Sequence, residues 1–166
     1  MLLVLLFLAV QPADTLNIGG AHFAKSNMEF GRGEVSLAAA DVNGDGQLDL
    51  LWASQNDGEV TVLAGNGAGA FAHTGTVGAG ASPNQFVATD LDGDGNLDLV
   101  MANHETAYIT VLLGDGLGGF APAPGSPVDV NVDPHPHAVA TVDVNGDGLL
   151  DLVVDDRNRG GLLVLS

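Results

Sequence analysis

The sequence predicts an all-β protein built from repeated β-sheets, and two observations carry this prediction. A ten-residue motif rich in Asp, Asn and Gly occurs three times, at residues 41–50, 90–99 and 143–152. The copies begin 49 and 53 residues apart, a period typical of propellers and solenoids. Short apolar runs rich in β-formers flank every copy, and no helical period does. The motifs are therefore predicted to connect strands.

Residues 1–13 are predicted to be a signal peptide or a leading apolar strand. The apolar run that follows Met1 ends at Val10, well short of the roughly 20 residues that cross a bilayer. This length is usual for the core of a signal peptide, and Ala13 provides a small residue for cleavage. No Lys or Arg precedes the run, and residues 2–6 resemble the strand-forming residues 162–165. A buried strand is therefore the alternative.

Residues 14–166 are predicted to form one segment of three units, at residues 34–80, 81–132 and 135–166. Each unit contains the motif between two apolar runs, and the first two end in a glycine-rich tail that closes with Phe71 or Phe120. The third unit lacks this tail. Residues 16–30 lie about as far before the first motif as the tail of the first unit lies before the second motif, but no motif precedes them. The two ends are therefore predicted to complete one shared sheet.

The motif has the donor spacing of a calcium loop. Oxygen ligands at positions 1, 3 and 5, a glycine at 6, a backbone carbonyl at 7 and a carboxylate at 9 suit a hard cation that takes six to eight oxygens. Ten carboxylates occupy the three loops, and without a cation they would repel one another. A helix–loop–helix site is excluded, because position 12 holds Trp52, Met101 or Val154 instead of the required Glu.

About three Ca²⁺ ions are therefore expected, one in each loop. The middle loop is expected to bind most tightly, because Asp92 stands where the other loops have Asn and affinity follows ligand charge. The predicted side-chain ligands are Asp41, Asn43, Asp45 and Asp49; Asp90, Asp92, Asp94 and Asp98; and Asp143, Asn145, Asp147 and Asp151. The predicted carbonyl ligands belong to Gln47, Asn96 and Leu149.

Composition narrows the classes of partner. The net charge is −17 with only four Lys and Arg residues, so the chain repels phosphate backbones and nucleic-acid binding is not expected. The chain has no cysteine, which excludes disulfides and thiol ligands. No Ser or Cys nucleophile is framed by the scattered histidines, so no enzyme activity and no catalytic residue is predicted.

The motif, the strand after it and the tails at residues 65–71 and 114–120 together resemble the FG-GAP and VCBS repeats of integrin α-subunit propellers and of many secreted proteins. The resemblance covers nearly the whole chain from about Leu16 onward, and the VCBS variant is the closer match. It implies four-stranded β-propeller blades with calcium in the loop between the first two strands. Three blades are fewer than the four to eight of closed propellers. Either the chain is a fragment of a longer propeller, or copies join head to tail.

The expected function is that of a secreted or cell-surface, calcium-binding module that binds an extracellular protein or glycan, as in cell adhesion. This expectation follows from the resemblance alone. One alternative is a lectin built of the same repeats. Another is an accessory piece of a larger surface protein or enzyme.

Overall fold

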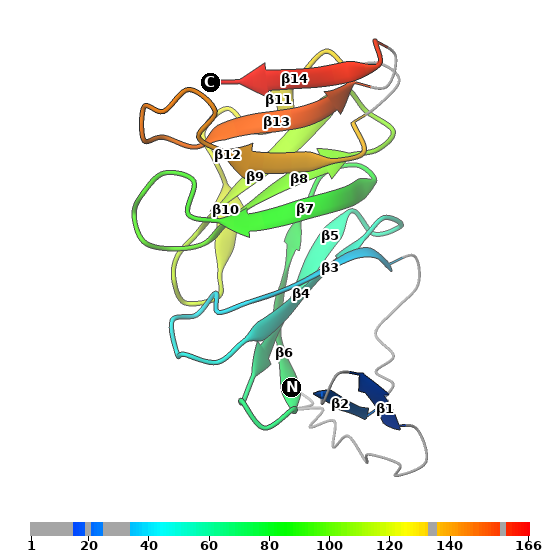
Figure 1. Ribbon diagram of the computed structural model, residues 1–166, viewed down its shortest axis with the longest axis vertical. Helices are drawn as coiled ribbons and strands as arrows, with labels where there is room; N and C mark the ends of the chain where they lie inside the picture. Colours follow the sequence, from blue (N-terminus) through cyan, green and yellow to red (C-terminus); the bar gives the residue numbers. More distant parts are fainter. Residues whose placement is uncertain (1–14, 19–20, 25–33, 133–135, 157–158) are drawn as a thin grey trace.

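The computed structural model describes residues 15–18, 21–24, 34–132, 136–156 and 159–166. Every regular element in these residues is a β-strand (Figure 1). The described part of the chain contains no helix that is long and apolar enough to cross a membrane. The predicted signal peptide or leading strand at residues 1–13 lies outside the described residues, so it stays a prediction.

The first sheet is a four-stranded antiparallel meander, with its strands in chain order. At its central hairpin the Gly58 N–H donates to the Ser54 carbonyl over 3.0 Å, and Gly58 has a φ of 67°, which a side chain would disfavour. This strand order is that of a propeller blade. The strands are β3 (Glu34–Ala40), β4 (Asp49–Ser54), β5 (Glu59–Gly65) and β6 (Phe71–Gly78).

The second sheet repeats this order, but its fourth strand is divided. β10 pairs with the end of β9 and β11 pairs with its beginning. β10 ends at Pro122, and Pro124 follows in the gap between the two pieces; proline has no N–H to donate to a ladder. Ser126 fills part of the gap, because its hydroxyl accepts the Val111 N–H over 2.9 Å. The strands are β7 (Pro83–Thr89), β8 (Asp98–Asn103), β9 (Tyr108–Gly114), β10 (Phe120–Pro122) and β11 (Val128–Asp129).

The third sheet has three strands, in the order β12 (Val139–Val142), β13 (Asp151–Asp156) and β14 (Gly161–Leu165). β1 (Thr15–Ile18) pairs with β2 (Ala21–Ala24) in a sheet of its own. No pairing between these strands and β14 exists in the described residues. The shared sheet expected from residues 16–30 thus stays a prediction.

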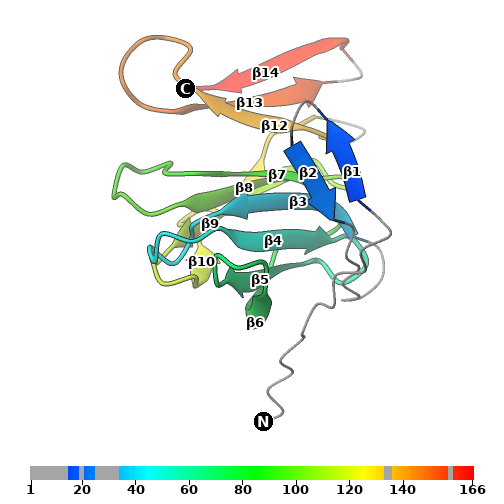
Figure 2. The same cartoon turned by 60° about the horizontal axis from the view of Figure 1, so that its bottom comes forward.

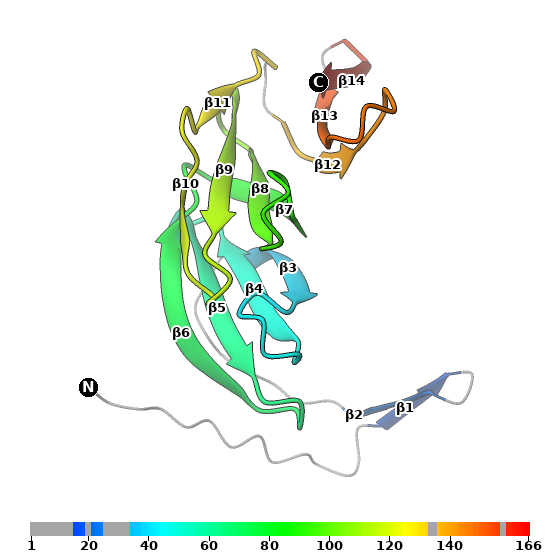
Figure 3. The same ribbon diagram turned by 90° about the vertical axis from the view of Figure 1, so that its left-hand side faces the viewer.

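The three large sheets stack face to face (Figures 2 and 3). Leu51 and Val62 of the first sheet pack with Phe86 and Met101 of the second in one apolar core. The opposite side of the second sheet packs on the third around Val100 and Val154 in another. The second sheet is therefore packed on both sides, and the predicted all-β fold of propeller-type blades is confirmed.

Candidate metal centre

The three acidic loops join equivalent strands, β3 to β4, β7 to β8 and β12 to β13. They lie at the same end of the stacked sheets (Figure 1). Positions 4 and 6 of every loop have positive φ, between 71° and 92°, which only glycine adopts without strain. These glycines are Gly44, Gly46, Gly93, Gly95, Gly146 and Gly148.

The carboxylate at position 1 closes each loop on itself. One oxygen of this carboxylate accepts the N–H of the position-6 glycine, over 2.8 Å at Asp41, 3.0 Å at Asp90 and 2.9 Å at Asp143. The N–H groups of Gly148 and then Gly146 hold the pKa of Asp143 below its ordinary value, because they stabilise the ionised form. Asp143 therefore carries its charge at neutral pH.

Positions 3 and 5 each accept a backbone N–H two residues further on, as in an Asx turn. At position 3, Asn43, Asp92 and Asn145 accept over 2.9, 3.1 and 2.8 Å. At position 5, Asp45, Asp94 and Asp147 accept over 2.8, 2.7 and 2.8 Å. The same bonds in three copies show that the sequence repeat is a repeat of loop geometry.

The carboxylate at position 9 is different, because it is buried in every copy. Asp49, Asp98 and Asp151 are 0, 1 and 3% exposed. Each accepts the N–H of the position-2 residue through Oδ2, over 3.1, 2.8 and 2.8 Å. These side chains thus reach back from the second strand and hold the start of the loop.

In the first two sheets the position-9 carboxylate makes a second connection. Its Oδ1 accepts the N–H of the last residue of the third strand, Gly65 for Asp49 and Gly114 for Asp98, over 2.9 Å in both sheets. Ligand spacing alone did not predict this role. The recurrence of Gly65 and Gly114 at the same distance after Asp41 and Asp90 is the signal that could have found it.

The middle loop brings three carboxylates together. One oxygen each of Asp90, Asp92 and Asp98 lies within 4.8 Å of the others. Asp94 is not in this group, and its oxygens accept the N–H and the side-chain amide of Asn96. In the first and third loops an Asn occupies position 3. In the first loop the Asn43 Nδ2 donates to Asp49 Oδ1 over 3.4 Å, and the Asn43 Oδ1 accepts the Asp45 N–H. The donors are all hard oxygens, which fits Ca²⁺ and not a soft metal.

The tails of the first two units form a second set of matched turns. Asp115 accepts the N–H groups of Leu117 and Gly119 over 2.8 Å each, and Asn66 accepts the equivalent two from Ala68 and Ala70. The Leu117 N–H and then the Gly119 N–H hold the pKa of Asp115 below its ordinary value of 3.8.

Asp115 is charged and Asn66, at the equivalent place in the first tail, is neutral. The contribution of the Asp115 turn to stability should therefore depend on pH. A depressed pKa contributes stability above the unfolded value, and this contribution is lost as the pH falls through the folded value. We expect Asp115→Asn to lower the thermal midpoint slightly at pH 7, and the gap from the unchanged protein to close below about pH 4. The converse Asn66→Asp variant should gain at pH 7 and lose that gain in acid. Thermal unfolding at several pH values checks both, and a gap that widens in acid would contradict them.

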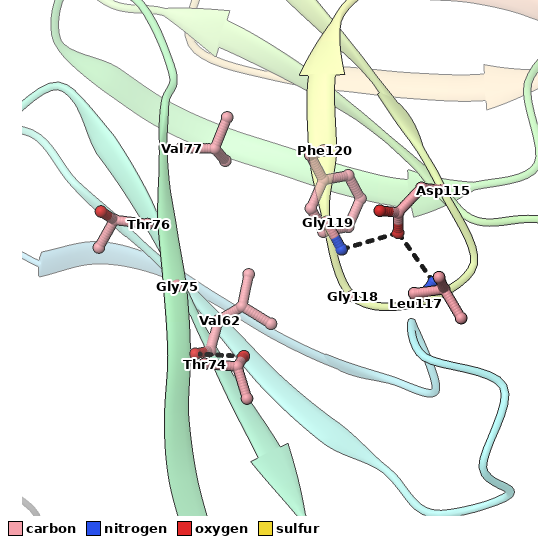
Figure 4. A pocket seen from close by; sticks show the side chains of 10 residues that line it. All are labelled: Val62, Thr74, Gly75, Thr76, Val77, Asp115, Leu117, Gly118, Gly119 and Phe120. Carbon is pink, nitrogen blue, oxygen red and sulfur yellow. Dashed lines mark hydrogen bonds between the residues drawn. The ribbon is translucent and has the colours of Figure 1, made fainter. Parts of the chain in front are cut away.

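A pocket of about 360 Å³ lies between β6 and the second tail. Val62, Val77 and Phe120 give it apolar walls, and Asp115 and Thr74 add polar groups. Figure 4 shows the Asp115 carboxylate on the tail side, while the Thr74 hydroxyl donates to the Val62 carbonyl over 3.1 Å.

Fold and loops together define an all-β repeat protein whose propeller-type blades carry an oxygen-rich loop between their first two strands. Residues 41–101 and 90–154 both match the family model described as FG-GAP-like repeat. The two matches together run from residue 41 to 154, more than half of the 166 residues. The chain therefore belongs to the family of FG-GAP-like repeat proteins.

A solved structure of TcdB2-TccC3 without its hypervariable C-terminal region is also similar. It is 24% identical with a TM-score of 0.48, and the match covers 86% of this chain and 7% of that chain. Comparison with curated proteins finds no match.

Proposed function

We propose that this chain is a calcium-binding, non-enzymatic β-propeller module that acts outside the cell, either secreted or at the cell surface, and binds an extracellular protein. The observation that carries the calcium proposal is the convergence of Asp90, Asp92 and Asp98. Three ionised carboxylates at this separation repel one another unless a cation lies among them. Asp98 is 1% exposed, so water screens its charge poorly.

The loop geometry supports one Ca²⁺ in each copy. Each carboxylate or amide oxygen in the hydrogen bonds described above has a second lone pair, so accepting an N–H does not prevent it from binding a cation. Bound calcium would supply positive charge to the loop and tie position 9, which belongs to the second strand, to positions 1 and 3. The carbonyl of position 7 completes the expected donor set, as predicted for Gln47, Asn96 and Leu149.

Calorimetric titration with Ca²⁺ tests this proposal and the order of affinities. We expect about three sites, with the tightest in the middle loop. Asp92→Asn gives that loop the donor set of the other two and should weaken its site to their level. Asp115→Asn removes the same charge outside the loops, so it should leave all sites unchanged. The absence of calcium binding would overturn the proposal, and an unchanged tightest site in Asp92→Asn would overturn the order.

The extracellular role is supported by the family, because FG-GAP-like repeats are typical of extracellular proteins. The net charge of −17 separately opposes binding to nucleic acid. We place the binding surface on the loops at the ends of the blades, since loops on a rigid scaffold carry most binding sites. Binding of the labelled chain to intact cells or matrix, in calcium and after chelation, tests this role. Binding that stays at the background level both in calcium and after chelation would contradict the extracellular role.

A carbohydrate is the second candidate ligand, because the pocket between β6 and the second tail combines apolar walls with hydroxyl and carboxylate groups. Such a mixture suits a sugar, which has an apolar face and a polar rim. Glycan-array binding that a simple sugar competes away would favour this candidate. Its loss in a Thr76→Trp variant, which fills the pocket, would locate the site.

A further inference from the structure

The second tail, residues 114–120, is hydrogen-bonded to two different acidic loops. At its start, the Gly114 N–H donates to Asp98 Oδ1 of the middle loop over 2.9 Å. At its turn, the Gly118 N–H donates to the Val42 carbonyl of the first loop over 3.0 Å. Gly118 is labelled at this turn in Figure 4. One short segment therefore joins the loops of two neighbouring sheets.

The contact on the first loop falls where it can order predicted ligands. Val42 stands at position 2, between Asp41 and Asn43. Its N–H donates to Asp49 Oδ2 over 3.1 Å, and its carbonyl accepts from Gly118. Val42 is 4% exposed, so water competes poorly for these two groups. A fixed second tail therefore holds the backbone that carries two ligands of the first loop.

The second tail also lies close against both loops. A Cβ atom on Gly116 would overlap the side chain of Asn96, at position 7 of the middle loop. On the first loop, a Cβ atom on Gly44 would lie 3.6 Å from the Gly116 carbonyl oxygen. One on Gly118 would lie 3.6 Å from the Cβ of Asn43. Since packed groups transmit displacement to their neighbours, a shift of the tail should be felt in both loops.

The turn of the second tail is held by its own hydrogen bonds. The Asp115 carboxylate accepts the N–H groups of Leu117 and Gly119 over 2.8 Å each. The Asp115 N–H donates to the Gly119 carbonyl over 3.0 Å. Gly118 lies inside this closed turn, so its N–H keeps a fixed direction relative to Gly114.

On the basis of the proposed calcium binding, we propose that the second tail couples the first and middle loops, so that calcium in either loop raises the affinity of the other. A cation held by Asp98 would fix the carboxylate to which Gly114 is bonded, and the ordered tail would hold Val42. The first loop would then lose less conformational freedom on binding, which gives positive cooperativity. The coupling is reciprocal, because the two binding free energies are linked.

Titration of the whole chain with Ca²⁺, followed by NMR, measures the two loops separately. The Gly46 and Gly95 amides donate to the position-1 carboxylates of the first and middle loops, so their signals should shift as each site fills. Asp92→Ala removes one converging carboxylate of the middle loop and leaves Asp98 in place. We expect this variant to weaken the first site, followed at Gly46, by about fivefold or more.

The reciprocal variant is Asn43→Ala, which removes the position-3 oxygen of the first loop and keeps the Cβ atom that lies beside Gly118. It should weaken the middle site, followed at Gly95, by the same factor as Asp92→Ala weakens the first.

Replacement of Asp115 tests the part played by the second tail. Asp115→Ala removes the acceptor of two turn N–H groups, so in this background Asp92→Ala should change the first site by less than about twofold. Asp115→Asn is the matched control, because Asn66 accepts the equivalent two bonds in the first tail. It removes the same charge but should leave the coupling intact.

Gly118→Ala is a second variant for the case that Asp115→Ala does not fold. Gly118 has a φ of 87°, which a side chain disfavours, so the turn should shift away from Val42 and the coupling should fall. Gly69→Ala is its control. Gly69 has a φ of 85° at the same place in the first tail, and in the described residues no hydrogen bond joins it to an acidic loop.

The outcomes separate the coupling from calcium binding itself. If the amides shift with calcium but Asp92→Ala leaves the first site unchanged, calcium binds and the coupling is overturned. A first site that becomes tighter in Asp92→Ala would also overturn it, since repulsion between the cations would then dominate. Coupling that survives both Asp115→Ala and Gly118→Ala would overturn the role of the tail. Amides that respond to calcium in neither loop would overturn the proposed function, and the coupling with it.

Discussion

Chelation of calcium is expected to lower the free energy of unfolding by about 8 kcal/mol when the free calcium concentration is a hundred times the dissociation constant. Each site occupied only in the folded state then contributes about 2.7 kcal/mol, and three loops are proposed to bind. This is as large as the whole stability of many domains. For a chain of this size the thermal midpoint should fall on the order of 20 °C.

Thermal unfolding in calcium and in an excess of chelator measures this change. Magnesium should restore much less of the stability, because it requires octahedral geometry and dehydrates reluctantly. Denaturant unfolding under the two conditions gives the free energies directly. Equal midpoints in calcium and in chelator would remove the proposed role of the cation in holding the loops.

Replacement of Asp98 by Ala is expected to cost about 2–6 kcal/mol even in chelator. Its carboxylate is 1% exposed and accepts the N–H groups of Leu91 and Gly114. Without it both donors lose their acceptor, and an unsatisfied buried donor costs about 1–3 kcal/mol. Asp151→Ala should cost about half as much, since its carboxylate accepts only the Val144 N–H in the described structure.

Asp94→Ala is the matched control, because Asp94 is exposed and, among the residues that the structure describes, its oxygens accept only from Asn96. Its effect on stability in chelator should be small. Denaturant midpoints of the three variants, measured without metal, separate the hydrogen bonds of position 9 from the binding of calcium. A loss in Asp98→Ala no larger than in Asp94→Ala would contradict the buried role of position 9.

Much of the fold could be predicted because it depends on local patterns. The strands on either side of each loop follow from short apolar runs, and the loops follow from Asp, Asn and Gly at fixed spacing. The turn at Gly58 likewise follows from neighbouring residues, since Asn, Asp and Gly favour turns and Gly58 has a positive φ. The division of the fourth strand of the second sheet was not predicted. It depends on where Pro122 and Pro124 meet the edge of β9.

The all-β class, the repeat and the oxygen-rich loops could be predicted from the sequence, because these features depend on residues that are neighbours in the chain. The convergence of oxygens required the tertiary structure, since Asp98 reaches Leu91 and Gly114 through the pairing of separate strands. It also shows that Val164 and Leu162 are exposed, while Val62 and Val60, at the same places in the first unit, are buried. Apolar residues that repeat in sequence look alike, and only the stacking of sheets determines which of them still face water.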